Sequence, residues 1–516
     1  MSLSDLLTRA KNLHQKGDAK AAMPLYQQAL LQRPNDPETL YYTAAAKIHL
    51  KDFKGGATLC DRLLKIKPDL PDALFLRGCA MQSLGATQKA VADFNKTIMM
   101  QPQNHTAHAN LGIALTHLKR FDDAIASLLK AVKIKPDYAI GYKNLGAAYF
   151  EAGQIQGAKT AFETSLSLNP NDALCHYNLG KAQAGLARFD EAIASYNTAL
   201  RLHPGLVDAR WNKSLIMLRE GDFEQGWQLY ESRWDNSQFT DRKPDVKAPY
   251  WTGKAEIAGK SLLLFSEQGL GDSIQFVRLV RQLAEKGAII TLAVQKPLMR
   301  LCQQIEGVST VIDRRGKLPE CDFMCSLMSL PLALGINADT PELARPYLAP
   351  DPQRVQSFKA LLKDSKKPRI GLVWSGSATH TNDHNRSIAL ADIIRHLPKD
   401  YDFFCLQKDI RPDDQKILAA SPVIKTAADL NKGQRFFDFD DTAALCSLMD
   451  RIVTVDTSIA HLAGALGVPT IVMLSAVTDF RWLRERQDSP WYSSVTLVRR
   501  RIDEDNWDRV IKEALA

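Results

Sequence analysis

The sequence predicts an α-solenoid of paired helices, followed by an α/β part that is built from two similar halves. Three observations support this prediction. Six prolines recur every 34 residues up to Pro204, short apolar runs alternate with helical patterns from Lys260 onward, and this alternation begins again near Arg369. A chain of 516 residues with 45% apolar residues is long enough for a solenoid and one or two compact domains.

The 34-residue period is that of tetratricopeptide repeats, in which each unit is a helix–turn–helix closed by a proline. The prolines are Pro34, Pro68, Pro102, Pro136, Pro170 and Pro204. Taking each as position 32 places repeat starts at residues 3, 37, 71, 105, 139 and 173, with a partial seventh at 207. Small residues then share position 20, where they let the two helices of a unit pack closely: Ala22, Gly56, Ala90, Ala124, Ala158 and Ala192. This register predicts six full repeats and a partial seventh over residues 1–235.

An asparagine also recurs with the repeat, at position 6 of the first helix: Asn110, Asn144, Asn178 and Asn212. Amides on the inner surface of a solenoid can donate to and accept from the backbone of an extended peptide, whatever its sequence. We expect these residues to bind a protein acceptor. The alternative is that asparagine is simply common at this position of such repeats.

The seventh unit differs from the others because it lacks the closing proline and contains Trp211, Trp227 and Trp234. Large aromatic residues in a terminal repeat usually bury a surface against the next domain. The sequence therefore predicts a rigid joint here, followed by a connecting segment at residues 236–260.

The remaining sequence predicts two halves with parallel sheets, an N-terminal half at residues 261–350 and a C-terminal half at residues 365–516, with a linker around residues 351–367 between them. The expected strands span residues 261–266, 288–294, 308–312, 322–326, 369–374, 403–406, 451–455 and 470–474. Two such halves place a cleft at the carboxyl ends of both sheets, where ligands of open α/β folds bind.

Two motifs follow predicted strands. Gly269-Leu-Gly-Asp272 lacks the third glycine and the downstream acid of a dinucleotide fingerprint, and it is not followed by the Gly-Lys-Ser/Thr of a phosphate loop. The second motif opens with Asp456, Thr457 and Ser458, which are all favoured helix N-caps. The positive end of a helix at that place suits the phosphates of a nucleotide, and a capped helix without a ligand is the alternative.

These two motifs together resemble the signatures of bacterial heptosyltransferase-type glycosyltransferases of the GT-B fold. With the repeats, and with Trp374-Ser-Gly-Ser377, Asn382-Asp-His-Asn-Arg-Ser387 and Ser489-Pro-Trp-Tyr492, the whole chain is similar to bacterial repeat-bearing glycosyltransferases. That group includes flagellin O-glycosyltransferases, and its architecture is like that of O-GlcNAc transferase. The resemblance implies a GT-B fold of two Rossmann-like halves, a nucleotide-sugar donor bound mainly by the C-terminal half, and an inverting reaction that needs no metal.

The resemblance also implies roles for individual residues. Asp272 is the expected catalytic base, with helix capping as its alternative role and Glu267 as a reserve candidate. Gly269 and Gly271 are expected on the acceptor side. Donor contacts are expected from Trp374, Ser375, Gly376, Arg386, Gln407, Lys408, Asp456, Thr457, Ser458 and His461. His380 and His384 are further candidates for contact with donor or acceptor.

We therefore expect an enzyme that transfers a sugar from a nucleotide-activated donor to Ser/Thr hydroxyls of a protein, for example flagellin, held by the repeat arm. A transferase for a saccharide or lipid-linked acceptor and a non-catalytic adaptor are the alternatives. We expect no cofactor and no metal, and the donor stays open between a nucleoside diphosphate sugar and a cytidine monophosphate nonulosonate.

Bulk properties narrow the setting of this activity. A net charge of +8 without a dense basic run argues against nucleic-acid binding. The sequence has no run of 18 apolar residues, so we expect no membrane span. The eight cysteines are scattered, which favours reduced thiols and a cytoplasmic location.

Overall fold

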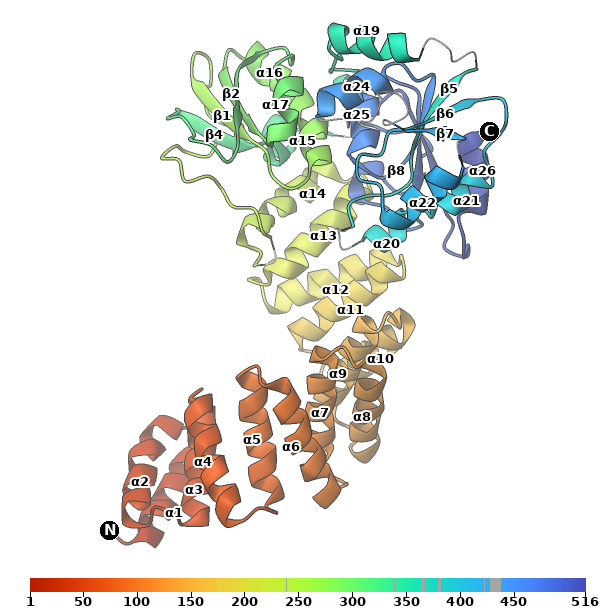
Figure 1. Cartoon of the computed structure of the whole chain (residues 1–516). Coiled ribbons are helices and arrows are strands. Elements are labelled where there is room, and N and C mark those ends of the chain that lie inside the picture. The colour runs from red at the N-terminus through yellow and green to blue at the C-terminus, as the bar shows by residue number, and fades with distance from the viewer. Residues whose placement is uncertain (238, 338, 363–366, 379–381, 422, 427–437) are drawn as a thin grey trace. The chain divides into compact units, whose positions relative to one another are not determined.

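The computed structural model describes residues 1–237, 239–337, 339–362, 367–378, 382–421, 423–426 and 438–516 (Figure 1). The chain divides into two compact units, Met1–Ala209 and Arg210–Ala516. No helix within these described ranges is both long enough and apolar enough to cross a bilayer.

The first unit consists of helical pairs. The first helix of each pair begins at residue 3, 37, 71, 105, 139 or 173, so the predicted repeat register is confirmed. Asp36 shows how a helix start is fixed, because its carboxylate accepts the Thr39 N–H at 2.8 Å and a proline occupies the next position. The helices are α1 (Leu3–Gln15), α2 (Ala19–Gln32), α3 (Pro37–His49), α4 (Phe53–Ile66), α5 (Pro71–Ser83), α6 (Thr87–Met100), α7 (His105–His117), α8 (Phe121–Ile134), α9 (Ala139–Glu151), α10 (Ile155–Leu168), α11 (Ala173–Gly185) and α12 (Phe189–Leu202).

Close packing within each pair depends on a small residue that faces a large one. A Cβ added to Gly146 of α9 would lie 2.6 Å from the Phe162 ring of α10, and one added to Gly180 of α11 would lie 2.6 Å from the Tyr196 ring of α12. Both rings are almost fully buried. The glycines therefore create the space that these rings fill between the helices of a pair.

The partial seventh repeat is formed by α13 (Val207–Arg219) and α14 (Phe223–Tyr230), followed by the 3-10 turn η1 (Glu231–Asp235). Trp227 of α14 is 1% exposed, and its ring centroid lies 5.6 Å from that of Phe276 and 5.7 Å from that of Phe480. Phe223 stacks on Trp491 at 5.7 Å. The prediction that this repeat buries aromatic residues against the α/β part is confirmed.

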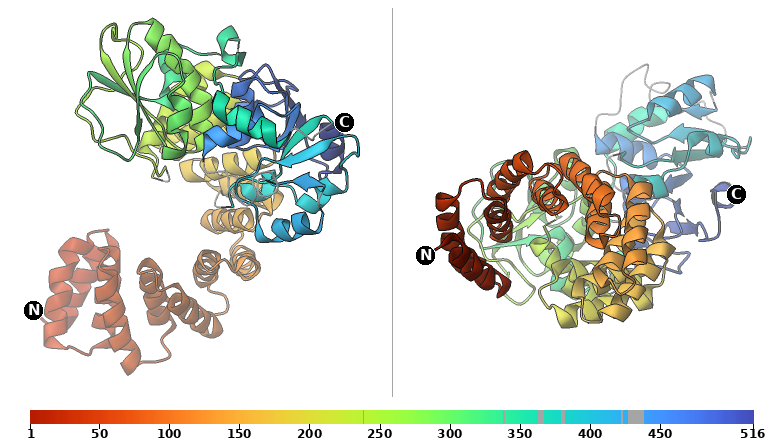
Figure 2. Two further views of the ribbon diagram at one scale, coloured as in Figure 1. Left: turned by 45° about the horizontal axis from the view of Figure 1, so that its top comes forward. Right: turned by 90° about the horizontal axis from the view of Figure 1, so that it is seen from below.

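The second unit contains two sheets in which all strand pairs are parallel (Figures 1 and 2). The four-stranded sheet has the order β3-β2-β1-β4 and the six-stranded sheet the order β10-β9-β8-β5-β6-β7. The eight predicted strands are present, whereas β7 and β10 were not predicted. The strands are β1 (Ser261–Phe265), β2 (Ile289–Val294), β3 (Val308–Asp313), β4 (Phe323–Ser326), β5 (Arg369–Val373), β6 (Asp402–Cys405), β7 (Ile424–Lys425), β8 (Arg451–Val455), β9 (Thr470–Leu474) and β10 (Val495–Arg499).

Helices and 3-10 turns connect these strands. The linker expected around residues 351–367 includes a helix, α19, whose start is fixed by Asp351, because its side chain accepts the Gln353 N–H at 2.8 Å. The helices are α15 (Leu270–Phe276), α16 (Val280–Glu285), α17 (Met299–Cys302), α18 (Leu330–Leu334), α19 (Pro352–Leu361), α20 (Asp383–Arg386), α21 (Leu390–Ile394), α22 (Pro412–Ala420), α24 (Phe439–Cys446), α25 (Ser458–Leu466) and α26 (Asp508–Leu515), and the 3-10 turns are η2 (Val277–Leu279), η3 (Lys296–Leu298), η4 (Leu327–Ser329), η5 (Pro341–Ala344) and η6 (Phe480–Trp482).

One continuous apolar core joins the two sheets. It contains Leu262 and Leu264 of β1, Trp227 of α14, Ile452 of β8 and Leu462 of α25, all almost fully buried. Because the last repeat pair shares this core, its position is fixed relative to both sheets.

Candidate functional site

The two sequence motifs meet where α15 and α25 begin. α15 follows β1 and α25 follows β8, so both helices start at carboxyl ends of parallel strands. A Cβ on Gly271 would lie 2.8 Å from His461 Cδ2 and 3.5 Å from Ser458 Cα. A side chain at position 271 would thus separate the two helices, and glycine there lets their first turns touch.

Asp272 occupies the third position of α15, where its carboxylate turns back and accepts the Gly269 N–H at 2.7 Å. Its other oxygen pairs with the guanidinium of Arg481. Burial raises the pKa of Asp272, and the nearby Arg481 charge opposes that rise. The capping role considered for Asp272 is therefore present, together with an ion pair that the sequence did not predict.

Arg481 is the main site residue that sequence reasoning missed. It lies in η6, after β9, and its side chain is 9% exposed. It pairs with Asp272 from the first half and with Asp479 at 2.6 Å, and its Nε has no hydrogen-bond partner among the described residues. Asp272 and Arg481 are 209 positions apart, and nothing in the sequence between them marks the pair.

Asp456 completes this carboxylate–guanidinium cluster. Burial, followed by the neighbouring charge of Asp479, raises the pKa of Asp456 to about 6, and the charges of Arg386 and Arg481 oppose the rise. Three carboxylates and two guanidinium groups therefore gather at the carboxyl ends of β1, β8 and β9. Buried carboxyl groups with raised pKa values, as in Asp272 and Asp456, are typical of functional sites.

Arg386 lies across the end of β5. Its Nη1 donates to the Asp456 carbonyl oxygen at 3.1 Å, and a Cβ on Gly376 would lie 2.5 Å from its Nη2. Its Nε is buried and has no hydrogen-bond partner within the described part of the chain. The same Nε lies 3.9 Å from Asp383 Oδ1 in an ion pair. The predicted residues Gly376, Arg386 and Asp456 are thus brought together.

The expected contacts from Trp374, Ser375 and Gln407 serve the protein itself. Trp374 is fully buried, and its indole N–H donates to Asp414 Oδ2 at 2.9 Å. Gln407 Oε1 accepts the backbone N–H groups of Trp374 at 3.2 Å and Ser375 at 3.0 Å, and its Nε2 donates to Ser375 Oγ. These hydrogen bonds connect the carboxyl end of β5 to the carboxyl end of β6. Lys408 is exposed and forms no ion pair with a described residue.

The residues at the start of α25 differ in burial and in hydrogen bonding. Thr457 is the N-cap, and its Oγ1 accepts the Ile459 N–H at 3.3 Å, whereas the Ser458 hydroxyl makes no hydrogen bond with a described residue. His461 is 4% exposed, its Nδ1 lies 2.9 Å from Tyr492 Oη, and its ring stacks on Trp482. Burial lowers the pKa of His461 well below its ordinary value, which favours the neutral form of the ring, and the donor contact expected from His461 stays a prediction.

The repeated asparagines differ in their bonding. Asn110 Nδ2 donates to the Thr106 carbonyl of its own helix at 2.9 Å. Asn144 and Asn178 are half-buried and make no hydrogen bond with a described residue. Asn212 lies in the second unit, on α13. Two of the four amides are therefore available to an external group.

A metal ion would need several close ligands. No group of three or more His, Cys, Asp and Glu side chains in the described residues is arranged to hold one. His384 lies in α20, and His380 lies outside the described residues.

Comparison with known proteins matches parts of the repeat region to family models. A model described as "TPR repeat" matches residues 114–153, and models described as "Tetratricopeptide repeat" match residues 13–77, 144–207 and 177–232. Protein FlbA of Caulobacter vibrioides is 26% identical over 313 residues, which cover 56% of this chain and 51% of FlbA. The chain thus spans about half the length of this relative.

Solved structures with similarity to the chain include MamA, YrrB and PilW. MamA is 24% identical over 33% of this chain and 92% of its own, with a TM-score of 0.30. YrrB, described as a TPR protein with an unusual peptide-binding site, is 18% identical over 37% of this chain and 98% of its own, with a TM-score of 0.32. PilW, a type IV pilus biogenesis factor, is 20% identical over 40% of this chain and 96% of its own, with a TM-score of 0.38. The family models and the helix register show that the chain contains tetratricopeptide repeats, followed by a second unit that contains two parallel sheets.

Proposed function

We propose that the protein is a glycosyltransferase of the GT-B type, which transfers a sugar from a nucleotide-activated donor to Ser/Thr hydroxyls of a protein acceptor, with flagellin as the first acceptor to test. The observation that carries this proposal is the cluster of Asp272, Arg481, Asp456 and Arg386, which is assembled from both sheets. Clefts at the carboxyl ends of parallel strands are the usual ligand sites of open α/β folds.

In this proposal the donor phosphates lie at the start of α25. The helix end supplies positive potential, Ser458 supplies a hydroxyl, and Arg386, which also pairs with Asp383, supplies a guanidinium charge. Arg481 is the natural partner of the leaving phosphate because a guanidinium binds two oxygens side by side.

Transfer then requires a base for the acceptor hydroxyl. Asp272 takes that proton while the acceptor oxygen bonds to the sugar carbon, the bond from that carbon to the phosphate oxygen breaks, and its electron pair leaves on the phosphate. When Arg481 turns from Asp272 to the phosphate, Asp272 loses its counter-charge and its pKa rises further, which makes it a stronger base. Donor binding thereby activates the base.

The acceptor side of the proposal uses the repeats. Asn144 and Asn178 hold equivalent positions on successive first helices, and both amides are free within the described residues. Changing both to alanine should weaken acceptor binding and leave donor binding intact. Equal acceptor affinity in the double variant would remove these amides from the proposal.

The deciding experiment is intact-mass measurement of flagellin co-expressed with the protein and a supply of nucleotide sugars. Asp272→Asn keeps the size of the side chain and removes the base, and Asp351→Asn changes a capping carboxylate of α19 as the matched control. We expect a mass increase equal to a sugar with the natural protein and with Asp351→Asn, but not with Asp272→Asn. A modified acceptor in the Asp272→Asn cells would refute the assigned base.

A non-catalytic adaptor is the second candidate, favoured by one observation. Both carboxylate oxygens of Asp272 already have partners, Gly269 and Arg481. The cluster therefore also stabilises the contact between the two halves. An adaptor would bind acceptor protein but no nucleotide sugar, and a donor-binding titration separates the two functions. Transfer to a free saccharide or a lipid-linked acceptor, with flagellin left unmodified, would reassign the acceptor and keep the enzyme.

A further inference from the structure

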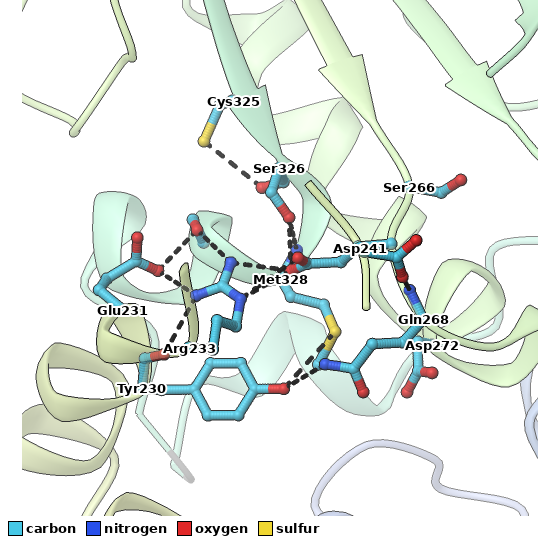
Figure 3. A network of polar contacts seen from close by, with 12 residues as sticks. Tyr230, Glu231, Arg233, Asp241, Ser266, Gln268, Asp272, Cys325, Ser326 and Met328 are labelled. Carbon is cyan, nitrogen blue, oxygen red and sulfur yellow. Dashed lines mark hydrogen bonds and ion pairs between the residues drawn. The ribbon is translucent and has the colours of Figure 1, made fainter. Parts of the chain in front are cut away.

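The turn that carries Asp272 is connected to the end of the last repeat by a buried ionic network (Figure 3). Its centre is Arg233 of η1, whose side chain is 0% exposed. Arg233 donates to Glu267 at 2.8 and 3.0 Å, to Glu231 at 2.6 Å and to Ser329 Oγ at 2.7 Å. All three guanidinium nitrogens therefore have partners, and the group cannot turn without breaking several bonds.

Glu267 is the link from Arg233 to the turn. It stands two residues after β1, it is 2% exposed, and its Oε1 also accepts the Ser326 hydroxyl at 2.7 Å. Burial raises the pKa of Glu267, and Arg233 opposes the rise. A buried carboxylate that already accepts bonds from a guanidinium and a hydroxyl does not reach an acceptor. Glu267 is therefore not the base, and its role is structural.

Gln268 continues the link in a conformation that few residues adopt. Its φ of 57° lies in the left-handed region, which residues other than glycine normally avoid. Its N–H donates to Asp241 Oδ2 at 2.5 Å and its side-chain amide donates to Tyr230 Oη at 2.6 Å, and both contacts are drawn in Figure 3. Such a conformation persists only where the surroundings impose it, and here they include a residue of α14.

The next two steps reach the candidate base. The chain passes from Gln268 to Gly269, whose N–H is the donor that fixes one oxygen of Asp272 at 2.7 Å. Gln295 supports the same segment, because its Nε2 lies 3.3 Å from the carbonyl oxygens of both Gln268 and Gly269. Any displacement of Glu267 or Gln268 therefore moves the N–H that orients Asp272.

We propose that Arg233 is a positioning residue for Asp272, so that the end of the last repeat forms part of the machinery that aims the base. The effect on the rate of transfer rests on the proposed function, whereas the effect of Arg233 on the conformation of the turn does not. The opposing explanation is an ion pair that only contributes stability. Loss of such a pair lowers global stability, and replacing both charges by apolar groups restores it.

The experiment compares three variants of the full chain. Arg233→Met leaves Glu267 buried without its partner, and the double variant Arg233→Met/Glu267→Met removes both charges. Arg354→Met is the matched control, because Arg354 also pairs with two carboxylates, those of Asp438 and Asp441, in a different part of the same unit. The measurements are amide hydrogen exchange over residues 266–276, the urea midpoint, and kcat and KM for sugar transfer.

We expect faster exchange over residues 266–276 in both Arg233 variants and unchanged exchange there in Arg354→Met. The double variant should regain most of the urea midpoint, yet its kcat should stay at least about tenfold below that of the natural protein, with KM for the donor within about twofold. Unchanged exchange in the turn, or a kcat that recovers together with the midpoint, would overturn the inference. If the natural protein transfers no sugar, the exchange data still decide whether Arg233 holds the turn that carries Asp272, and only the proposed function fails.

Discussion

Trp227 offers the sharpest test of how the last repeat joins the α/β part. Its indole is 1% exposed and touches aromatic rings from both halves, Phe276 beside the four-stranded sheet and Phe480 beside the six-stranded sheet. Its Nε1 has no hydrogen-bond partner among the described residues. Trp227→Ala removes the whole contact, and Trp227→Phe removes mainly the unpaired N–H and one ring.

The two variants should lower the free energy of unfolding by very different amounts. A buried tryptophan covers about 150–250 Å² of surface, which corresponds to about 4–6 kcal/mol at about 25 cal/mol per Å², and measured Trp→Ala changes in cores cost about 3–5 kcal/mol. We therefore expect Trp227→Ala to lower the free energy of unfolding by about 4 kcal/mol. In Trp227→Phe, loss of an unpaired buried donor returns about 1–3 kcal/mol, so its net cost should stay below about 1.5 kcal/mol.

Tryptophan fluorescence measures the relevant unit selectively, because all eight tryptophans lie at or beyond Trp211. With a urea slope of about 3 kcal/mol per M, Trp227→Ala should lower the midpoint by about 1.3 M and Trp227→Phe by less than about 0.5 M. Equal midpoints for the two variants, or a Trp227→Ala midpoint within about 0.3 M of the natural protein, would refute the packing argument.

Three further predictions concern the rest of the chain. Because burial raises the pKa of Asp456 to about 6, the folded protein holds a proton between about pH 4 and pH 6 that the unfolded chain releases, so the free energy of unfolding falls as pH rises through this window. Asp456→Asn should reduce that fall between urea midpoints at pH 4.5 and pH 7, and an unchanged fall would contradict the assignment. Gly146→Ala should destabilise the helical pairs by about 1–3 kcal/mol, measured by circular dichroism, because the new methyl group overlaps the Phe162 ring. In a thiol titration of the folded protein, Cys79 and Cys321 should react before the other six cysteines, which are buried, and early reaction of more than two thiols would disagree with this burial.

The helical part was predictable almost to the residue because its information is periodic. A helix start at Pro37 or Pro71 follows from a proline at the first helical position and from the 34-residue spacing. The buried strands were equally visible, since Leu262–Phe265 is an apolar run of strand length and Ile452–Val455 is interrupted only by Thr454. β10 was missed because it ends in a run of arginines, and β7 because two residues give no pattern.

The candidate site was predictable only where its residues belong to a motif. Asp456 directly follows β8, and Asp272 lies in the first turn of the helix that follows β1; such positions after the strands of a parallel sheet are visible in the sequence. Arg233 and Arg481 lie outside both motifs, and each meets its carboxylate only through the fold. Side-chain partners that are set by tertiary contact leave no local pattern to read.

Asp272 is held from two directions, and the two contacts differ in kind. Arg481 bonds directly to its carboxylate from a short 3-10 turn, and its Nε is unpaired among the described residues, so a phosphate can compete for this guanidinium. Arg233 acts through Glu267 from a fully enclosed position that no ligand reaches. In the proposed reaction the first contact is exchanged in every catalytic cycle, and the second stays in place throughout. A base that must lose one partner during turnover needs another anchor that does not move, and the end of the last repeat supplies it.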